Sequence, residues 1–361
     1  MVTKRDVFVV GGGPAGLAAA IALRLQGFSV TVADRNQPAI DKACGEGLMP
    51  GALDALRQLG VHLETGVPFP GIRFLGENIS VESRFPSGVG LGVRRTVLHQ
   101  ALLNRAIDLG VDLRWGTAAR SLGEIASQWI VGADGEHSQV RRWAGLDSAW
   151  MDSHRFGYRR HYLVSPGALP RDGLVEVYWG PACQLYVTQV SDHELCVVAM
   201  SRDSRVRLDD VIARIPEFAQ KLKGAVAVTT ERGAVSASRW LRRVQRGNIA
   251  LVGDASGSVD AITGEGLRLS FEQSLALADA MAGGNLSAYQ KAHRGFSARP
   301  AFMANLMLSM DWSAYLRRRA MRAFASQPNV FSKMLAAHVG ALSIPAFIRQ
   351  GMIPLTRSII L

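Results

Sequence analysis

Short apolar runs alternate with longer segments of helical spacing along the first part of the chain. Residues 7–10 form an apolar run that ends in three glycines, residues 15–25 are rich in Ala and Leu, and residues 29–33 are again β-branched. This pattern predicts a buried strand, a helix and a second strand. Helical spacing recurs at residues 52–59 and 97–109, and a further brief strand is expected at 129–131. The alternation predicts an α/β fold.

The pattern changes to strand-like runs between about residues 151 and 240. These runs, separated by Gly, Pro and Asp, are residues 174–179, 184–190 and 194–200. A buried strand returns at 249–252, a long helix is expected at 266–281, and the remainder is mostly helical. We therefore expect one discontinuous α/β domain from residues 1–150 and 241–289, an inserted β-rich lobe at 151–240, and a helical C-terminal segment at 290–361.

The composition fits a globular protein, because 48% of the 361 residues are hydrophobic. The three cysteines Cys44, Cys183 and Cys196 form no CxxC pair, and no His, Cys and Asp cluster has metal-ligand spacing. This usage predicts neither disulfides nor a metal site, and it favours a reducing cytoplasm. The apolar stretch after Lys4 and Arg5 runs directly into glycines, so we interpret it as a first strand rather than a signal peptide.

The net charge of +11 is concentrated near the C-terminus, where residues 290–361 contain ten Lys or Arg and one acid, Asp311. No nucleic-acid module accompanies this charge. Arg317–Arg319 beside Trp312 and Tyr315 is suited to anionic headgroups, whereas the apolar stretch at 334–348 is too short to span a bilayer. We expect either a peripheral membrane contact or helices that simply pack on the rest of the chain.

A glycine motif directly follows the first predicted strand. Gly11, Gly13 and Gly16 form a GxGxxG, with Pro14 and Ala15 opening the helix. In this context the glycines allow a tight turn, close approach of a pyrophosphate, and close packing of helix on strand. The second strand ends at Asp34, where a carboxylate can accept hydrogen bonds from ribose hydroxyls. The motif predicts a dinucleotide site.

A second carboxylate, Asp254, follows the strand at 249–252. Open α/β sheets bind ligands at the carboxyl ends of their strands. Two such carboxylates more than 200 residues apart suit a ligand longer than one nucleotide half, such as FAD. A plain Gly-Asp turn is the alternative interpretation of Asp254.

Together with Asp134-Gly135, these motifs resemble the flavoprotein superfamily that contains para-hydroxybenzoate hydroxylase, other aromatic monooxygenases and the geranylgeranyl reductases. The resemblance implies a Rossmann-like FAD-binding domain of the glutathione-reductase type with an inserted β-rich substrate lobe. It also implies that Asp34 binds the adenosine ribose, that Asp254 lies near the ribityl chain and pyrophosphate, and that Arg95 lies near the cofactor. Arg35 borders the adenine or is a solvated strand-end arginine.

Two loops resemble the reductase branch. Residues 42–48, with Cys44 and Gly45, are similar to its cysteine and glycine loop, and residues 263–267, with Gly264, Gly266 and Leu267, are similar to its TGEG turn beside the flavin. Gly257 and Ala261 stand where hydroxylases have a His and a Pro. Residues 185–190, in contrast, lack the Trp and Pro of the prenyl site of the reductases.

Few side chains are candidates for catalysis or substrate contact. Cys44 is either a thiol participant or a small loop residue, and Glu265 is either a proton donor or a capping carboxylate. Tyr178, Trp179 and Tyr186 either line a substrate pocket or form ordinary sheet packing. Our first hypothesis is an NADPH- or NADH-dependent monooxygenase acting on a hydrophobic aromatic or polyketide-like molecule. A reductase of prenyl or lipid double bonds and a non-catalytic flavin-binding redox sensor are the alternatives.

Overall fold

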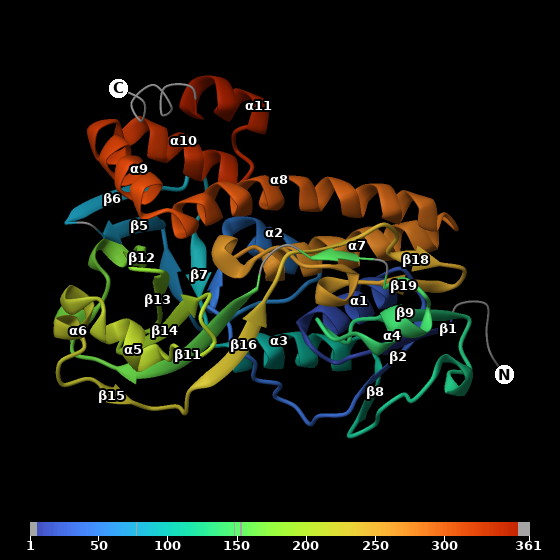
Figure 1. Cartoon of the computed structure of the whole chain (residues 1–361). Coiled ribbons are helices and arrows are strands. Elements are labelled where there is room, and N and C mark those ends of the chain that lie inside the picture. Colours follow the sequence, from blue (N-terminus) through green and yellow to red (C-terminus); the bar gives the residue numbers. More distant parts are fainter. Residues whose placement is uncertain (1–5, 77, 148, 152–153, 353–361) are drawn as a thin grey trace.

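The computed structural model describes all residues except 1–5, 77, 148, 152–153 and 353–361 (Figure 1). Its first sheet has the strand order β18-β19-β9-β1-β2-β8, parallel except for β18. The strands are β1 (Asp6–Val10), β2 (Ser29–Asp34), β8 (Asp112–Trp115), β9 (Trp129–Gly132), β18 (Gln245–Arg246) and β19 (Ile249–Leu251). The chain moves outward from β1 in both directions, which is the doubly wound order of dinucleotide-binding sheets.

Helices cover this sheet because its strands have apolar residues on both faces. Val7 and Val9 of β1 pack into the largest core, whereas Val10 packs into a smaller cluster on the other face. The helices on the large core are α1 (Pro14–Leu25), α2 (Pro50–Gln58), α3 (Arg95–Asp108) and α7 (Gly266–Ala282), and α4 (Gln139–Trp143) lies on the smaller cluster. The expected elements at the start of the chain and around residue 250 are therefore present, with ends shifted by a few residues.

The second large sheet has the order β15-β11-β14-β13-β12-β5-β6, with β16 also paired to β11. Its strands are β5 (Gly71–Gly76), β6 (Ile79–Arg84), β11 (Arg155–Leu163), β12 (Val175–Gly180), β13 (Cys183–Ser191), β14 (Glu194–Ser201), β15 (Val226–Ala227) and β16 (Arg232–Ser236). The helices α5 (Leu208–Ala213) and α6 (Pro216–Lys221) pack on one face of it. This is the expected β-rich lobe.

One boundary differs from the expectation. β5 and β6 lie within residues 1–150, yet β5 pairs in parallel with β12 and β6 forms the edge of the second sheet. The lobe is therefore assembled from two separate stretches of the chain. Phe74 of β5 and Val81 of β6 are buried against the C-terminal helices, and this packing explains why the hairpin joins the second sheet rather than the first.

The C-terminal segment is helical, as expected, and lies over both sheets in Figure 1. The long helix α8 (Leu286–Trp312) packs on α7 and leads to α9 (Ala314–Ser326), α10 (Pro328–His338) and α11 (Ile344–Phe347). α9 and α10 contact β6. Met303, Met307 and Met310 are buried in the core of this unit. No helix in the described part of the chain has the length and apolar character that a bilayer crossing requires.

Short pairings complete the fold. β3 (Gly47–Leu48), β7 (Gly90–Gly92) and β4 (Val67–Phe69) form a three-stranded sheet, and β10 (Ala149–Met151) pairs with β17 (Arg239–Leu241). β3 follows the loop of residues 41–46, which runs between the two large sheets and contributes to the site described next.

Candidate active site

A cavity of about 940 Å³ lies where the two large sheets and the C-terminal helices meet. Its volume is within the usual range for ligand sites. The predicted cofactor residues in its wall are Gly11, Gly13, Pro14, Ala15, Asp34, Arg35, Cys44, Gly45, Arg95, Asp254, Gly264, Gly266 and Leu267. Gly16 lies behind this wall. The fold therefore brings residues from both ends of the sequence to one site.

The glycine turn has the backbone geometry that the motif predicts. Gly11 has φ of 110°, and a Cβ there would lie 2.4 Å from the carbonyl oxygen of Ala133. A Cβ on Gly16 would lie 1.8 Å from the Gly11 carbonyl oxygen, so only glycine allows α1 to pack this closely on β1. Gly13 has open space on its Cβ side. This is the approach that a pyrophosphate at the N-terminus of α1 requires.

Asp34 is oriented by the same turn. Its Oδ2 accepts a hydrogen bond from the Gly12 amide at 2.7 Å, and its Oδ1 accepts one from the Asn36 amide at 2.8 Å. The neighbouring Arg35 is exposed and also lines the cavity. Fixed in this way, the Asp34 carboxylate is placed to receive a ribose.

Asp254 and Arg95 line the same cavity. Asp254 forms a half-exposed ion pair with Lys42 at 3.4 Å. The Nε of Arg95 is buried and has no hydrogen-bond partner among the described residues. An arginine in a cavity wall whose Nε has no hydrogen-bond partner among the described residues fits an anionic ligand such as a pyrophosphate.

Asp134 of the DG motif organises the turn before α4. Its carboxylate accepts hydrogen bonds from Ser138 Oγ at 2.5 Å and from the Gln139 amide at 2.6 Å. It therefore satisfies amides at the start of the helix, as an N-cap does. Gly135 follows with φ of 80° and faces the cavity.

A second helix N-terminus, that of α7, faces the cavity through Gly266 and Leu267. Gly264 has φ of 67°, a conformation that favours glycine, and no atom lies within 4 Å of a Cβ built on Gly266. Two helix N-termini thus point into one cavity, and each stabilises negative charge near it. The cavity is suited to a ligand with two separate regions of negative charge.

Glu265, for which the sequence left a proton donor and a capping carboxylate open, does not face the cavity. Its carboxylate is buried, forms an ion pair with Arg268 and lies 3.8 Å from Arg299. The side chain is absent from the cavity wall. The turn lines the cavity through Gly264 and Gly266, but the carboxylate points towards Arg268 and Arg299 and holds the N-terminus of α7 in position.

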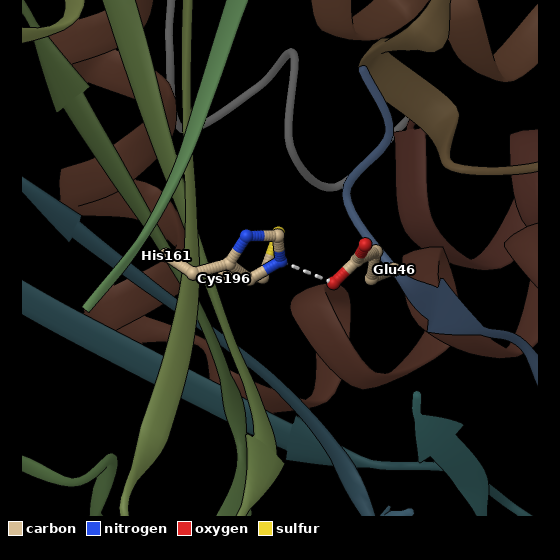
Figure 2. A group of neighbouring side chains, drawn as sticks. All are labelled: Glu46, His161 and Cys196. Carbon is tan, nitrogen blue, oxygen red and sulfur yellow. Dashed lines mark hydrogen bonds and ion pairs between the residues drawn. The ribbon is translucent and has the colours of Figure 1, made fainter. Parts of the chain in front are cut away.

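Cys44 lines the cavity, and its Sγ accepts a hydrogen bond from the Glu46 amide at 3.4 Å. Glu46 has φ of 56°, and its carboxylate binds two partners: the Arg95 amide at 2.9 Å and His161 Nε2 at 2.6 Å. Figure 2 shows Glu46, His161 and Cys196 converging from the loop, β11 and β14. The Cys44 loop is therefore tied to the second sheet by buried polar contacts.

The tautomer of His161 follows from its other contacts. Arg159 Nη1 lies 2.9 Å from His161 Nδ1, and an arginine can only donate. Nδ1 is then an acceptor, so the proton is on Nε2 and is donated to Glu46. Although burial alone would raise the pKa of Asp41, Arg159 and Arg232 lower it, and these ion pairs fix the start of the loop.

Glu46, His161 and Cys196 offer three ligand atoms within 4.8 Å of one another, a group that the sequence analysis did not foresee. Burial and the Glu46 carboxylate raise the pKa of the Cys196 thiol, which disfavours the thiolate that a metal needs. The Arg159 guanidinium beside His161 also opposes a cation. The geometry therefore favours a hydrogen-bonded cluster over a metal centre.

Beyond the turn at Gly264, the cavity is walled by apolar side chains from both lobes. From the second sheet and its hairpin come Ile72, Phe74, Val175 and Val177, and from the C-terminal helices come Met303, Met307, Phe331, Met334 and Leu335. Flexible methionines on two helices adapt to irregular apolar ligands. This inner part is suited to a hydrocarbon group.

The three aromatic residues predicted to line a pocket have different positions. Tyr186 lines the cavity, and its buried hydroxyl has no hydrogen-bond partner among the described residues. Burial raises its pKa, despite the nearby Arg155 charge. Tyr178 instead donates to Glu176 at 2.7 Å and packs on Phe218, on the face covered by α6. Trp179 packs on Phe74 in the core and does not line the cavity.

His338 is a cavity residue that the sequence analysis missed. It lies at the end of α10, is 6% exposed, and has its Nε2 3.7 Å from Glu265 Oε1. Burial lowers its pKa, with further lowering by Arg299 and an opposing effect of Glu265. A lone histidine in an apolar segment gives no signal in one sequence; only the packing of α10 against the turn at Gly264 reveals it.

The chain belongs to the FAD binding domain family, which it matches over residues 4–124 and 117–285. It is 29% identical over 335 residues to the menaquinone reductase of Mycolicibacterium smegmatis, covering 81% of this chain and 80% of that protein. It is 27% identical over 312 residues to the 12-dehydrotetracycline 5-monooxygenase/anhydrotetracycline 6-monooxygenase of Streptomyces rimosus, covering 76% and 62% of the two chains.

Its fold matches that of a geranylgeranyl bacteriochlorophyll reductase-like protein from Thermoplasma acidophilum, with a TM-score of 0.74, 18% identity and 98% of each chain covered. The protein is thus an FAD-dependent oxidoreductase, as its sequence predicted. The open side of Gly13, the Arg95 Nε and the two helix N-termini fit the negatively charged groups of FAD.

Proposed function

We propose that this protein is a reductase that uses FAD and NADPH or NADH to saturate a carbon–carbon double bond in a long apolar substrate. The observation that carries this proposal is the apolar inner part of the cavity, which continues from the turn at Gly264 to Phe331 and Met334. A prenyl or similar hydrocarbon chain needs such a surface, because burying each CH₂ group contributes about 0.8 kcal/mol.

Local features favour reduction over the hydroxylation that was our first hypothesis. Gly257 and Ala261 occupy the positions where hydroxylases have a His and a Pro, and Cys44 lines the cavity as the reductase loop implies. The relative named menaquinone reductase covers most of the chain, which supports the same choice. These observations outweigh the missing Trp and Pro in residues 185–190.

When bound, FAD supplies a hydride from its reduced ring, and a proton from solvent or a nearby group completes the addition across the double bond. The protein binds FAD and the substrate, orients them, and excludes water from the site. In this proposal α1 and Arg95 hold the pyrophosphate, Asp34 holds the ribose, and the N-terminus of α7 stabilises negative charge on the reduced ring. Tyr186 and His338 are the polar groups that orient the substrate within an otherwise apolar wall.

Anaerobic turnover tests the proposal. Protein loaded with FAD is reduced with NADPH, NADH or dithionite under nitrogen and mixed with menaquinone or a geranylgeranyl lipid. We expect reoxidised flavin without oxygen and products that remain heavier by two hydrogen atoms after exposure to air, which returns any quinol to the quinone but leaves a saturated bond unchanged. Products that contain oxygen from labelled gas, with no turnover in its absence, would reject the reductase.

Cys44→Ser tests whether the thiol takes part in the reduction. The serine hydroxyl has nearly the volume of the thiol but does not form an anion at neutral pH. If the thiol takes part in reduction, activity should fall by several orders of magnitude while FAD remains bound. Cys183→Ser is the control, because Cys183 is buried in the core beside α5 and α6, away from the cavity. Equal activities of the two variants would leave Cys44 without a chemical role.

A monooxygenase is the second candidate, favoured by Tyr186 in the cavity wall, whose hydroxyl lies near the Arg155 guanidinium. Such a group can bind the phenol or enol oxygen of an aromatic substrate. A substrate that accelerates NADPH or NADH oxidation and receives oxygen from labelled gas would support it. Flavin reduction that never leads to turnover with any substrate would instead favour the redox sensor.

A further inference from the structure

Three arginines are gathered on the outer face of α9. Arg318, Arg319 and Arg322 line one small surface cleft together with Tyr315, and we name these four residues the α9 basic face. Their spacing of three and four residues places them on neighbouring turns of the helix. Arg319 donates to the Tyr315 hydroxyl at 3.0 Å, so one of the arginines is held in place by the aromatic ring beside it.

The charges of the α9 basic face are not neutralised within the described part of the chain, where none of its arginines forms an ion pair. Asp311 is the one acid among residues 290–361, and it is buried and paired with Arg202 and Arg155. Most buried arginines of the molecule have carboxylate partners, as Arg155 and Arg159 do. The α9 basic face therefore presents uncompensated positive charge to the outside.

Exposed apolar side chains adjoin this charge at the junction of α8 and α9. Trp312 and Tyr315 are each 56% exposed, and Leu316 is 37% exposed. Aromatic rings with a polar edge prefer the boundary between water and hydrocarbon, and neighbouring arginines bind phosphate groups. Exposed aromatic and basic residues in one short segment are typical of a surface that meets a lipid bilayer.

The inner side of the same helix packs against side chains that form the wall of the cavity. Met321 and Phe324 of α9 pack in one cluster with Met307 and Phe331, both of which line the cavity. The unit α8–α10 thus has an apolar cavity on one side and the α9 basic face on the other. A hydrocarbon-binding site and a lipid-facing surface on one unit are consistent with each other.

We propose that the α9 basic face, with Trp312 and Leu316, docks this protein on an anionic phospholipid surface. The arginines contact headgroup phosphates, and the exposed apolar side chains enter the interfacial region. The proposal concerns binding alone and holds whichever reaction the flavin performs.

Vesicle flotation tests the proposal with the FAD-loaded full chain. We expect it to float with vesicles of phosphatidylcholine mixed with phosphatidylglycerol, and to remain in solution with phosphatidylcholine alone. Attachment should weaken as salt is added, because salt screens charges separated by more than about 10 Å at 0.1 M ionic strength. Equal binding to both vesicles, unaffected by salt, would overturn the electrostatic mechanism.

A matched pair of double variants localises the contact. Arg318→Gln with Arg322→Gln should weaken partitioning about 25-fold, since each arginine near an anionic surface contributes about fivefold. Arg242→Gln with Arg243→Gln removes the same charge from another exposed site and should have little effect. Equal loss in both variants would show that only net charge matters and would overturn the docking face.

Trp312→Ser should also weaken attachment, while Val226→Ser, at a 60% exposed position on β15, should not. Inorganic phosphate and an acidic peptide are titrated separately against the wild type. If either binds the α9 basic face while anionic vesicles do not bind the protein, the face is a site for a soluble anion and the membrane proposal is wrong.

Discussion

The same substitution at Gly13 and at Gly16 should have opposite consequences for stability and for FAD binding. At Gly16 the new methyl carbon would lie 1.8 Å from the Gly11 carbonyl oxygen and 3.2 Å from Ala133 Cβ. The first contact is with backbone, so α1 must shift on β1. We expect Gly16→Ala to destabilise even the FAD-free protein by about 1–3 kcal/mol, as overpacking does.

At Gly13 the methyl group meets no atom within 4 Å, and the residue has φ of −69°, which alanine adopts freely. The FAD-free protein should lose less than about 1 kcal/mol, mainly because alanine is a poorer N-cap than glycine. The methyl group would occupy the space where a pyrophosphate approaches. We therefore expect FAD binding to weaken at least tenfold, which is about 1.4 kcal/mol.

Urea unfolding of the FAD-free proteins measures the first quantity, and titration of FAD fluorescence measures the second. The result that refutes the reasoning is Gly13→Ala with wild-type FAD affinity, because the pyrophosphate would then not approach this turn. Normal stability of Gly16→Ala would show that the contact of α1 with β1 is less rigid than the structure indicates.

Burial lowers the pKa of His293 to about 4. Below about pH 6.5 the histidine is therefore protonated in the unfolded chain but stays neutral in the folded protein, so the free energy of unfolding should decrease as the pH falls towards 4. His293→Gln should flatten this fall by up to about 1.4 kcal/mol per pH unit in urea unfolding; an unchanged slope would contradict the assignment. Tyr186→Phe should alter substrate KM or kcat without loss of stability, whereas Tyr178→Phe should cost about 1–3 kcal/mol of stability with little kinetic effect, and the reverse pattern would exchange their roles. Added Zn²⁺ should not raise the melting temperature, because the positive charge of Arg159 opposes a cation at Glu46, His161 and Cys196. A clear rise would establish a metal site.

The fold class was predictable because its signals are local. The glycines after β1 must satisfy steric limits set within a few residues, and the strands of the first sheet are short apolar runs between helices of clear spacing. The family and the use of FAD followed from motifs that lie at strand ends. These features depend little on which distant segment packs against them.

β11 was not predicted, because its buried positions include charged residues rather than only apolar ones. Arg155 and Arg159 are fully buried on this strand, and each is paired with an acid more than 100 residues away, Asp260 and Asp41. In a sequence, arginines at every fourth position suggest a solvated surface rather than a core strand. The distant partners that make burial possible are visible only in the folded chain.

Only part of the candidate site was predictable, because the contacts that orient its side chains come from distant parts of the chain. Positions in the glycine turn and the turn at Gly264 lie in the cavity wall, but the direction of each side chain depends on the neighbouring elements. Glu265 points towards Arg268, and Tyr178 lies on the face of β12 that is turned away from the cavity. His338, from near the C-terminal end of the chain, lines the cavity. Apolar periodicity indicates which segments are buried, and it does not indicate which of them face a ligand.

The loop of residues 41–46 has a consequence for protein engineering. It carries Cys44 to the cavity wall, yet Asp41 and Glu46 bind residues of the second sheet, Arg159 and His161. A chimera that receives a foreign second sheet but retains its own loop would leave the buried Glu46 and the partly exposed Asp41 without these partners. A lost hydrogen bond to a charged group costs about 1.5–3 kcal/mol, which is a sizeable part of the stability of a typical domain. The unit of exchange between relatives should therefore be the sheet together with this loop, with the crossover placed before residue 41.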